Sequence, residues 1–386
     1  MKAISKPDQF KKRLHNRAGK LPALEQSAAQ GRDHWIPALV GILAIFGVIM
    51  IYSASSYTAQ KELSDSFYFV KKQLLGLGVG IAAFVFFALF DYRKFPKYAI
   101  WILIGSAVLL ALVFVPFIGV ESLGAKRWIG FGSFTIQPSE VAKFGYVIFC
   151  ACYLSKSEYR IQTFRGVLPI ILTGLALCGL ILAEPNMSIT VCVAMTMMIM
   201  LFVGGARIKH LVIMALPLLL CIPLLILAEP YRMKRLLAFL DPWASPKNEG
   251  YQLIQSLYAL GSGGWFGVGL FQSRQKYEFL PFAESDFIFS VIGEELGLIG
   301  CLVVIGLFLF LIYRGIRIAI RAKDRLGCYL AVGIVSVIAV QVLVNIAVVT
   351  GSIPPTGLPL PFISYGGSSL AVFLGASGIL YRISAG

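Results

Sequence analysis

The chain has 386 residues, of which 58% are apolar and only 14% are charged, whereas about 25% of the residues of an ordinary soluble domain are charged. This composition all but excludes a water-soluble globular protein. The seven cysteines lie within apolar stretches, so a secreted disulfide framework is excluded as well. A net charge of +15 would suggest nucleic-acid binding in a soluble protein, and the positions of the charges decide whether it does here.

Stretches long and apolar enough to cross a bilayer recur along the whole chain. A bilayer core about 30 Å thick needs roughly 20 mostly apolar residues in a helix. We expect ten spans, at residues 35–55, 74–90, 98–118, 138–154, 166–183, 187–205, 210–228, 286–313, 328–350 and 364–382. The region 166–205 also allows one long hairpin broken at Glu184-Pro185-Asn186. The predicted fold is all-α, a polytopic integral membrane protein with about ten transmembrane helices in residues 35–382.

Residues 1–34 form a basic tail with eight Lys and Arg and no apolar core, which argues against a cleavable signal peptide. If this tail is cytoplasmic, the inward segments hold about twice as many basic residues as the outward ones. The positive-inside rule then places both termini, including the short end 383–386, in the cytoplasm. Membrane topology accounts for the basic charge, so no nucleic-acid partner is expected.

The longest outward connection, residues 229–285, is the only one long enough to hold a site of its own, and loops of this length are usually functional or disordered. Within it, Ile254, Leu257 and Tyr258 share one helical face, with polar residues on another. This pattern predicts a short amphipathic helix at the membrane interface.

Several common catalytic motifs are absent from the sequence. It contains no strict GxGxxG, no GxxxxGK[ST] and no GxSxG, and its three histidines, His15, His34 and His210, are scattered. Nucleotide-driven, serine-hydrolase and zinc-dependent reactions therefore lose their usual support. An enzyme of this kind would need an already activated substrate, and a lipid-linked donor is one.

Four charged residues lie inside the predicted spans, where each costs several kcal/mol unless it is paired or faces water. Glu140 and Lys143 are three residues apart on one helix and can pair, while Glu294 and Glu295 are adjacent on the eighth span. A structural ion pair explains the first two as well as a polar cavity that opens outward does. Gln137 begins the Gln-Pro-Ser-Glu segment that opens this helix.

Asp286 stands at the start of the eighth span. A carboxylate at a helix N-terminus is stabilised by the free N–H groups, so simple capping is one explanation. Ser285 could supply the cap instead, and Glu284 is a second carboxylate beside it. An acid at the mouth of an intramembrane cavity also suits a general base.

Two outward loops contain further candidates. Lys126 and Arg127 could bind phosphate, although a membrane-interface belt around Trp128 explains the same residues equally well. The loop 354–369 has no charge and is rich in Pro, Gly and Ser, including Ser364. It is either a rigid re-entrant turn or a wall of a substrate site.

Together these segments resemble the SEDS family (shape, elongation, division and sporulation), whose branches are typified by FtsW, RodA and SpoVE. The matching motifs are Arg127-Trp128, Gln137-Pro-Ser-Glu140 with Lys143, Gly250-Tyr-Gln252 with Gln255-Ser256, Asp286-Phe-Ile-Phe289 with Glu294-Glu-Leu-Gly297, and Thr356-Gly357 through Ser364-Tyr-Gly-Gly-Ser-Ser369. The resemblance covers nearly everything from 35 to 382. The chain departs from the family's common Gln-Pro-Asp at Glu184-Pro185-Asn186, and before Asp286 at residues 281–285.

The resemblance implies a peptidoglycan glycosyltransferase that polymerises lipid II on the outer face of the bacterial cytoplasmic membrane. It implies as partners a class B penicillin-binding protein, which is a monofunctional transpeptidase, and other divisome proteins. The segments 241–243 and 273–276 are closer to the division and sporulation branches than to the elongation branch. Septal synthesis during cell division is therefore expected, with a RodA-like elongation polymerase, a lipid II flippase and a noncatalytic scaffold as alternatives.

The resemblance also implies roles for the candidate residues. As a hypothesis, Asp286 accepts the proton of the acceptor GlcNAc 4-hydroxyl, which attacks the anomeric carbon of the donor MurNAc and displaces undecaprenyl diphosphate with inversion. The expected substrate-binding residues are Arg127, Lys126, Glu140, Lys143, Gln137, Glu294, Glu295 and Ser364. Arg127 and Lys143 lead as groups that stabilise the diphosphate charge, with a divalent cation such as Mg²⁺ or Mn²⁺ as an open addition.

Overall fold

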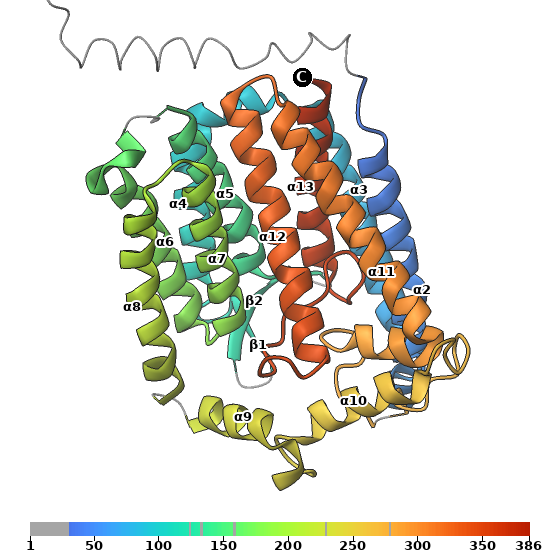
Figure 1. Cartoon of the computed structure of the whole chain (residues 1–386). Coiled ribbons are helices and arrows are strands. Elements are labelled where there is room, and N and C mark those ends of the chain that lie inside the picture. Colours follow the sequence, from blue (N-terminus) through green and yellow to red (C-terminus); the bar gives the residue numbers. More distant parts are fainter. Residues whose placement is uncertain (1–30, 123–124, 132–133, 157–159, 228–229, 278) are drawn as a thin grey trace, which may run out of the picture.

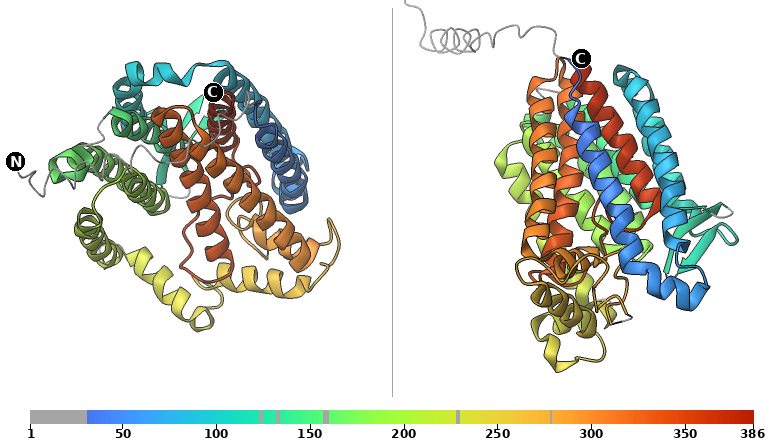
Figure 2. Two further views of the ribbon diagram at one scale, coloured as in Figure 1. Left: turned by 45° about the horizontal axis from the view of Figure 1, so that its top comes forward. Right: turned by 90° about the vertical axis from the view of Figure 1, so that its right-hand side faces the viewer.

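The computed structural model describes residues 31–122, 125–131, 134–156, 160–227, 230–277 and 279–386. The greater part of the basic tail predicted at 1–34 lies outside these residues. The described chain is a bundle of long helices that run up and down between two ends (Figure 1). A small sheet and two short helices cover one end only (Figures 1 and 2).

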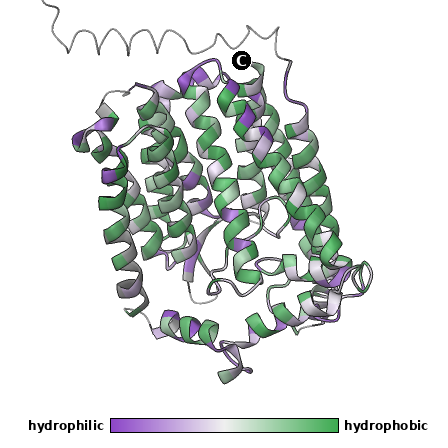
Figure 3. Cartoon of the chain, in the orientation of Figure 1, coloured by the Kyte–Doolittle hydropathy of each residue, from purple (hydrophilic) through white to green (hydrophobic). Residues whose placement is uncertain are grey.

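Ten long apolar helices of the described chain coincide with the ten expected spans. They are α2 (Trp35–Leu63), α3 (Tyr68–Leu89), α4 (Phe95–Leu112), α5 (Pro138–Lys156), α6 (Phe164–Ala183), α7 (Met187–Val203), α8 (Ile208–Leu227), α11 (Ile288–Arg321), α12 (Arg325–Val349) and α13 (Gly367–Ala385). Seven of them, all except α5, α7 and α8, are long and apolar enough to cross a membrane by length and hydropathy. Apolar residues dominate along their length, and polar ones gather toward their ends (Figure 3). The chain is a multi-pass membrane protein.

Some helices begin or end at other residues than expected, because the local backbone conformation determines where each helix stops. The first helix was expected to end near 55, but α2 continues until Ser64 adopts a left-handed conformation, with φ at 56°. The expected span at 364 starts three residues later because Gly366, with φ at 158°, precedes α13. The region 166–205 forms two helices, since the side chain of Asn186 accepts a hydrogen bond from the N–H of Ile189 and caps α7.

A three-stranded antiparallel sheet was missed by the sequence analysis, which treated this region as a loop. Its strands are β1 (Gly119–Ser122), β2 (Ala125–Phe131) and β3 (Phe134–Ile136), in the order β1-β2-β3. Ile129 pairs with Gly119 on one side and with Ile136 on the other. The strands are too short for hydrophobic alternation to stand out from the adjoining apolar helix. The sheet leads directly into α5 and so fixes where β2 meets the bundle.

Both ends of the described chain lie at the same end of the bundle (Figure 1). The backbone N–H of Asp33 donates to Ser384 Oγ at 3.0 Å, and the Asp33 carboxylate pairs with Arg314 at 2.7 Å. The sheet, α9 (Pro230–Leu240) and α10 (Tyr251–Gly263) lie at the opposite end (Figure 1). Helix α10 covers the predicted amphipathic segment. An even number of spans explains why the two termini meet.

Helices α12 and α13 form the centre of the bundle and are the most buried of the spans, whereas α3 is largely exposed. Helix α12 packs against α5, α7 and α11, and α13 packs against α3. Small residues allow this close contact: Gly76 of α3 faces Gly367 of α13 with no room for a side chain between them. The centre of the bundle is therefore closely packed, and it carries the loop before α13.

The junction of α10 with α11 depends on glycine. Helix α11 is interrupted at Gly297, whose φ of 67° and ψ of −167° are not helical. The chain after α10 fills the break with backbone hydrogen bonds, for example from the N–H of Val268 to the carbonyl of Glu294 at 3.0 Å. A Cβ on Gly263 would overlap the carbonyl oxygen of Gly293. These contacts hold the outer loop against the first turns of α11.

We predict that Gly263→Ala lowers the thermal stability of the purified protein because the added methyl group meets backbone rather than a flexible side chain. Overpacking of this kind costs about 1–3 kcal/mol. The control is Gly78→Ala on α3, where no atom lies within 4 Å of the added Cβ. Equal melting temperatures for the two variants would contradict the importance of this contact.

Candidate active site

Asp286 lies two residues before α11, in a loop that is pressed against the loop before α13. One carboxylate oxygen, Oδ1, accepts a hydrogen bond from Ser285 Oγ at 3.1 Å. The other, Oδ2, is 3.2 Å from the position of a Cβ on Gly357, so a side chain there would crowd the carboxylate. Asn345 of α12 donates through Nδ2 to the backbone carbonyls of Asp286, at 2.9 Å, and of Leu358, at 2.7 Å. A buried amide therefore fixes both loops around the acid.

Ser364 joins the same two loops through its hydroxyl group. It donates to the carbonyl of Ser285 at 2.6 Å and accepts from the N–H of Leu360 at 2.8 Å. The N–H of Tyr365 donates to the carbonyl of Glu284 at 2.8 Å. The Ser364 hydroxyl therefore positions the Asp286 loop, and substrate binding by Ser364 stays a prediction.

The surroundings of Asp286 raise the pKa of its carboxyl group above the ordinary value of 3.8. Burial of the half-buried side chain is the largest cause, and it outweighs the lowering by the Ser285 hydroxyl and by the positive charges of Arg235 and Arg127. A base whose pKa is raised toward neutral pH takes a proton more effectively in a transition state. A carboxylate that only caps a helix does not need surroundings that raise its pKa.

Arg127 of β2 reaches the corner between α6 and α7. Its Nε donates to the carbonyl of Glu184 at 3.1 Å, and its Nη2 donates to the carbonyl of Pro185 at 2.6 Å. Neighbouring residues of a strand point to opposite faces, so Lys126 is exposed on the other face of the strand. The two residues therefore lie in different surroundings, and phosphate binding by Lys126 and Arg127 stays a prediction.

Glu140 and Lys143 form a fully buried ion pair on α5, with 2.9 Å between Oε2 and Nζ. Lys143 Nζ also donates to Gln341 Oε1 at 2.5 Å and lies 5.2 Å from the ring centroid of Phe373. Gln341 in turn donates to the carbonyl of Pro359 at 2.9 Å. The pair is thus linked to the loop that contacts Asp286.

Several buried polar atoms around these residues have no hydrogen-bond partner within the described part of the chain. They include Ser139 Oγ, Glu140 Oε1, the Glu184 carboxyl oxygens, Asn345 Oδ1 and Thr356 Oγ1. Buried polar groups are normally satisfied, so this set is suited to a polar ligand. Gln137 opens α5 beside them, and its N–H approaches Ser368 Oγ at 3.4 Å.

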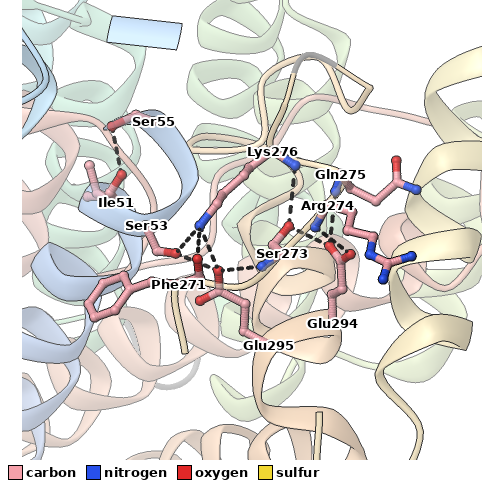
Figure 4. Close-up of polar contacts among 10 residues, drawn as sticks. All are labelled: Ile51, Ser53, Ser55, Phe271, Ser273, Arg274, Gln275, Lys276, Glu294 and Glu295. Atoms are coloured by element: carbon pink, nitrogen blue, oxygen red, sulfur yellow. Dashed lines mark hydrogen bonds and ion pairs between the residues drawn. The ribbon is translucent and has the colours of Figure 1, made fainter. Parts of the chain in front are cut away.

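The carboxylates of Glu294 and Glu295 are bonded to residues of the outer loop and of α2 (Figure 4). Glu294 accepts hydrogen bonds from Ser273 Oγ at 2.5 Å and from the N–H of Arg274 at 2.8 Å. Glu295 accepts from Ser53 Oγ at 2.5 Å and pairs with Lys276 at 3.4 Å. Desolvated carboxylates need such partners, and here they hold the outer loop against α11 and α2. Substrate binding by these two acids stays a prediction.

Three residues near Asp286 were missed by the sequence analysis. Gln341 and Asn345 are four residues apart in an apolar span, and polar side chains inside a membrane helix are a usable signal. Arg235 lies on the basic, amphipathic helix α9 and, with Lys234, lines an open hollow of about 500 Å³. The electrostatic effect of Arg235 on Asp286 could not be predicted from the sequence, because it depends on how the folded chain brings the two residues together.

The sequence matches the model of a family described as "Cell cycle protein", FtsW/RodA/SpoVE, over residues 33–386. The chain belongs to the FtsW/RodA/SpoVE family. Stage V sporulation protein E of Bacillus subtilis is 44% identical over 344 residues, which cover 89% of this chain and 94% of that protein. A probable peptidoglycan glycosyltransferase FtsW of Geobacter metallireducens is 44% identical over 343 residues, covering 89% and 92%. The SEDS resemblance is thereby confirmed.

Solved structures of FtsW/RodA/SpoVE relatives share the fold. A chain from a structure entitled "Structural coordination of polymerization and crosslinking by a peptidoglycan synthase complex" is 29% identical, with a TM-score of 0.76, and the match covers 92% of this chain and 98% of that one. The rod shape determining protein RodA of Thermus thermophilus is 25% identical, with a TM-score of 0.67 over 92% and 97%. The predicted membrane-embedded helical bundle is confirmed.

Proposed function

We propose that this chain is a peptidoglycan glycosyltransferase that polymerises lipid II into β-1,4-linked glycan strands and releases undecaprenyl diphosphate. The observation that carries the proposal is the environment of Asp286: a half-buried carboxyl group with a raised pKa, in a loop braced by Ser364 and Asn345. A relative at 44% identity is named for this activity, and the match covers 89% of this chain.

In this proposal, Asp286 accepts the proton of the acceptor GlcNAc 4-hydroxyl as that oxygen attacks the anomeric carbon of the donor MurNAc. The bond from that carbon to the diphosphate breaks, and undecaprenyl diphosphate leaves with the bonding electrons. One general base suffices because diphosphate is already a good leaving group. Arg127 and Arg235, whose charges both act on Asp286, would stabilise the developing diphosphate charge.

Lys143 and Glu140 take a different part in this proposal. They are fully buried and paired, and Lys143 is linked through Gln341 to the loop beside Asp286. We assign them to the wall of the polar region, where Gln137 and the unpaired polar atoms would contact the sugar hydroxyls. A neutral, polyhydroxylated ligand fits this set of hydrogen-bonding groups better than a second anion would.

A divalent cation enters this proposal only as an addition. Among the described residues, no three His, Cys, Asp or Glu side chains lie together as a metal site. Mg²⁺ often binds chiefly to substrate phosphates and water with few protein ligands, and the lipid diphosphate could hold Mg²⁺ or Mn²⁺ in that way. No step above depends on a metal.

The setting of the reaction is part of the same proposal. In this proposal, both termini lie in the cytoplasm, and the end of the bundle that holds Asp286 lies on the outer face of the cytoplasmic membrane. The basic tail supports this orientation through the positive-inside rule. The partners would be a class B penicillin-binding protein and other divisome proteins, since a relative of similar fold comes from a synthase complex. Septal synthesis is favoured over elongation because relatives named FtsW are 44% identical.

The experiment that tests the function uses liposomes that contain the full chain, its class B partner and fluorescent lipid II confined to one leaflet. Polymer on a gel, without transfer of lipid II between leaflets, is the expected result. Transfer without polymer would support a flippase and contradict the proposal. A complex that shows neither activity, while the purified chain remains folded, would favour a scaffold.

A further inference from the structure

Gln73 is a buried polar residue of α3 that the proposed reaction does not use. Its side chain is 0% exposed, and it shares a buried face of the helix with Val70, Gly76 and Gly80. This face packs against α13, where Gly76 meets the backbone of Gly367. An amide group inside a membrane span is costly unless its polar atoms are hydrogen-bonded. Gln73 therefore needs partners near the start of α13.

The amide group of Gln73 binds the turn before α13 with both of its polar atoms. Its Nε2 donates to the carbonyl of Ser364 at 3.3 Å, and its Oε1 accepts from the N–H of Gly366 at 3.0 Å. A side-chain amide carries a donor and an acceptor on one planar group, so it can make both bonds while remaining neutral. The two bonds hold the peptide groups on both sides of Tyr365.

The other side of the same turn holds the loop that carries Asp286. The N–H of Tyr365 donates to the carbonyl of Glu284 at 2.8 Å, and the Ser364 hydroxyl donates to the carbonyl of Ser285 at 2.6 Å. The peptide group that accepts from Gln73 through its oxygen is therefore the one that donates to Glu284 through its nitrogen. Hydrogen bonds that run through one peptide group strengthen each other. A shift of this peptide would move the two residues before Asp286.

We propose that Gln73 is a positioning residue for glycosyl transfer: it holds the turn 364–366, and this turn holds Asp286 where it takes the proton of the acceptor hydroxyl. The proposal rests on the proposed function. Gln73 acts through Ser364 and Tyr365, because the hydrogen bonds of its amide run to the backbone of the turn.

The test measures kcat and KM for lipid II with the full chain and its class B partner, for wild type and Gln73→Met. Methionine has a similar length and volume but cannot replace the two hydrogen bonds. A misplacement of about 1 Å at a reacting group can lower a rate about 100-fold. We expect kcat to fall at least about tenfold, whereas KM should stay nearly unchanged because the bonds of Gln73 run to the turn.

The control is Tyr153→Phe near the other end of α5. It also removes one hydrogen bond from a side chain to the backbone of another segment, here from the Tyr153 hydroxyl to the carbonyl of Gly166 at 2.9 Å. This bond lies far along α5 from Glu140 and Lys143, so the control should keep the wild-type kcat. A folded Gln73→Met variant with the kcat of the control would overturn the proposal.

The pH profile distinguishes positioning from a purely structural role. Asp286 faces Arg127 of β2, Arg235 of α9 and Glu284 of its own loop, and all three remain in the variant. Burial raises the pKa of Asp286, so a looser loop should lower this pKa and move the acid limb of the rate to lower pH. The rate of Gln73→Met divided by that of wild type should therefore rise as the pH falls.

A smaller amount of folded enzyme would instead scale the rate by one factor at every pH, and such a constant ratio would overturn the positioning role. If Gln73→Met does not fold, Gln73→Asn carries the same two measurements, because its amide is one methylene group too short to reach both partners. The same fall in kcat and the same change of ratio with pH are expected. Absence of polymer from wild type would refute the proposed function itself.

Discussion

Replacing Asp286 with asparagine is expected to lower the rate of lipid II polymerisation at least about 100-fold, since a positioned general base contributes about 10²–10⁴ to a rate. The amide is nearly isosteric, and the backbone carbonyl of residue 286 still accepts from Asn345. The loop should therefore keep its place while the reaction loses its base. Fluorescent lipid II and a glycan gel measure the effect in the purified complex.

The pH dependence of the wild-type enzyme adds a second check on Asp286. A general base works only while it is deprotonated, so activity should be lost as the pH falls through the pKa of Asp286. Burial raises this pKa above 3.8, which moves the acid limb upward from the position of an ordinary aspartate. The control Asp65→Asn removes an acid whose pKa is lowered by its hydrogen bond with Lys71 and should leave the acid limb unchanged.

Retained polymerisation in Asp286→Asn would show that the proton goes elsewhere, and Glu284 would be the next candidate. Its half-buried side chain also has a pKa raised by burial, and the charges of Asp286 and Glu62 add to the effect. A normal melting temperature for the variant is needed before either result is interpreted. The two acids are only two residues apart in the chain, so sequence alone could not rank them by environment.

The spans could be predicted from the sequence because a bilayer imposes a simple rule on length and apolarity, and α2 and α12 follow it. Strands β1 to β3 could not, because they are only a few residues long and lie beside apolar helix ends. Their effect on the site is large, since β2 directs Arg127 inward and Lys126 outward. When the segment is taken as a loop, the sequence does not show which of the two adjacent basic residues points inward.

The candidate site was predictable where a charge in the membrane demanded an explanation, as for Glu140, Lys143 and Asp286. The same rule does not by itself assign a role to Glu294 and Glu295, because it says that a buried acid needs partners without saying which. Their partners, including Ser273 and Lys276, lie about 20 residues upstream in a loop that has no helical period. Only the folded chain distinguishes an acid that holds a loop from one that meets substrate.

Lys143→Met is expected to destabilise the protein strongly because it leaves Glu140 buried without its partner. Both side chains of this pair are 0% exposed, and removal of one member of a buried ion pair typically costs about 3–5 kcal/mol. Methionine keeps most of the side-chain volume, so the loss comes from the charge and from the hydrogen bond to Gln341. Thermal unfolding of the purified protein, followed by size-exclusion chromatography after heating, measures it.

The double variant Glu140→Gln/Lys143→Met separates a structural pair from a functional one. It removes both charges together, so most of the lost stability should return, because two neutral side chains need no mutual compensation in a buried site. Lys71→Met is the control for a pair with Asp65 that is exposed to solvent, and its melting temperature should change little. If Lys143→Met melts like Lys71→Met, the buried pair contributes little to the fold. A stable double variant without polymerase activity would assign the pair to the substrate site, whereas full activity would leave the pair with a structural role alone.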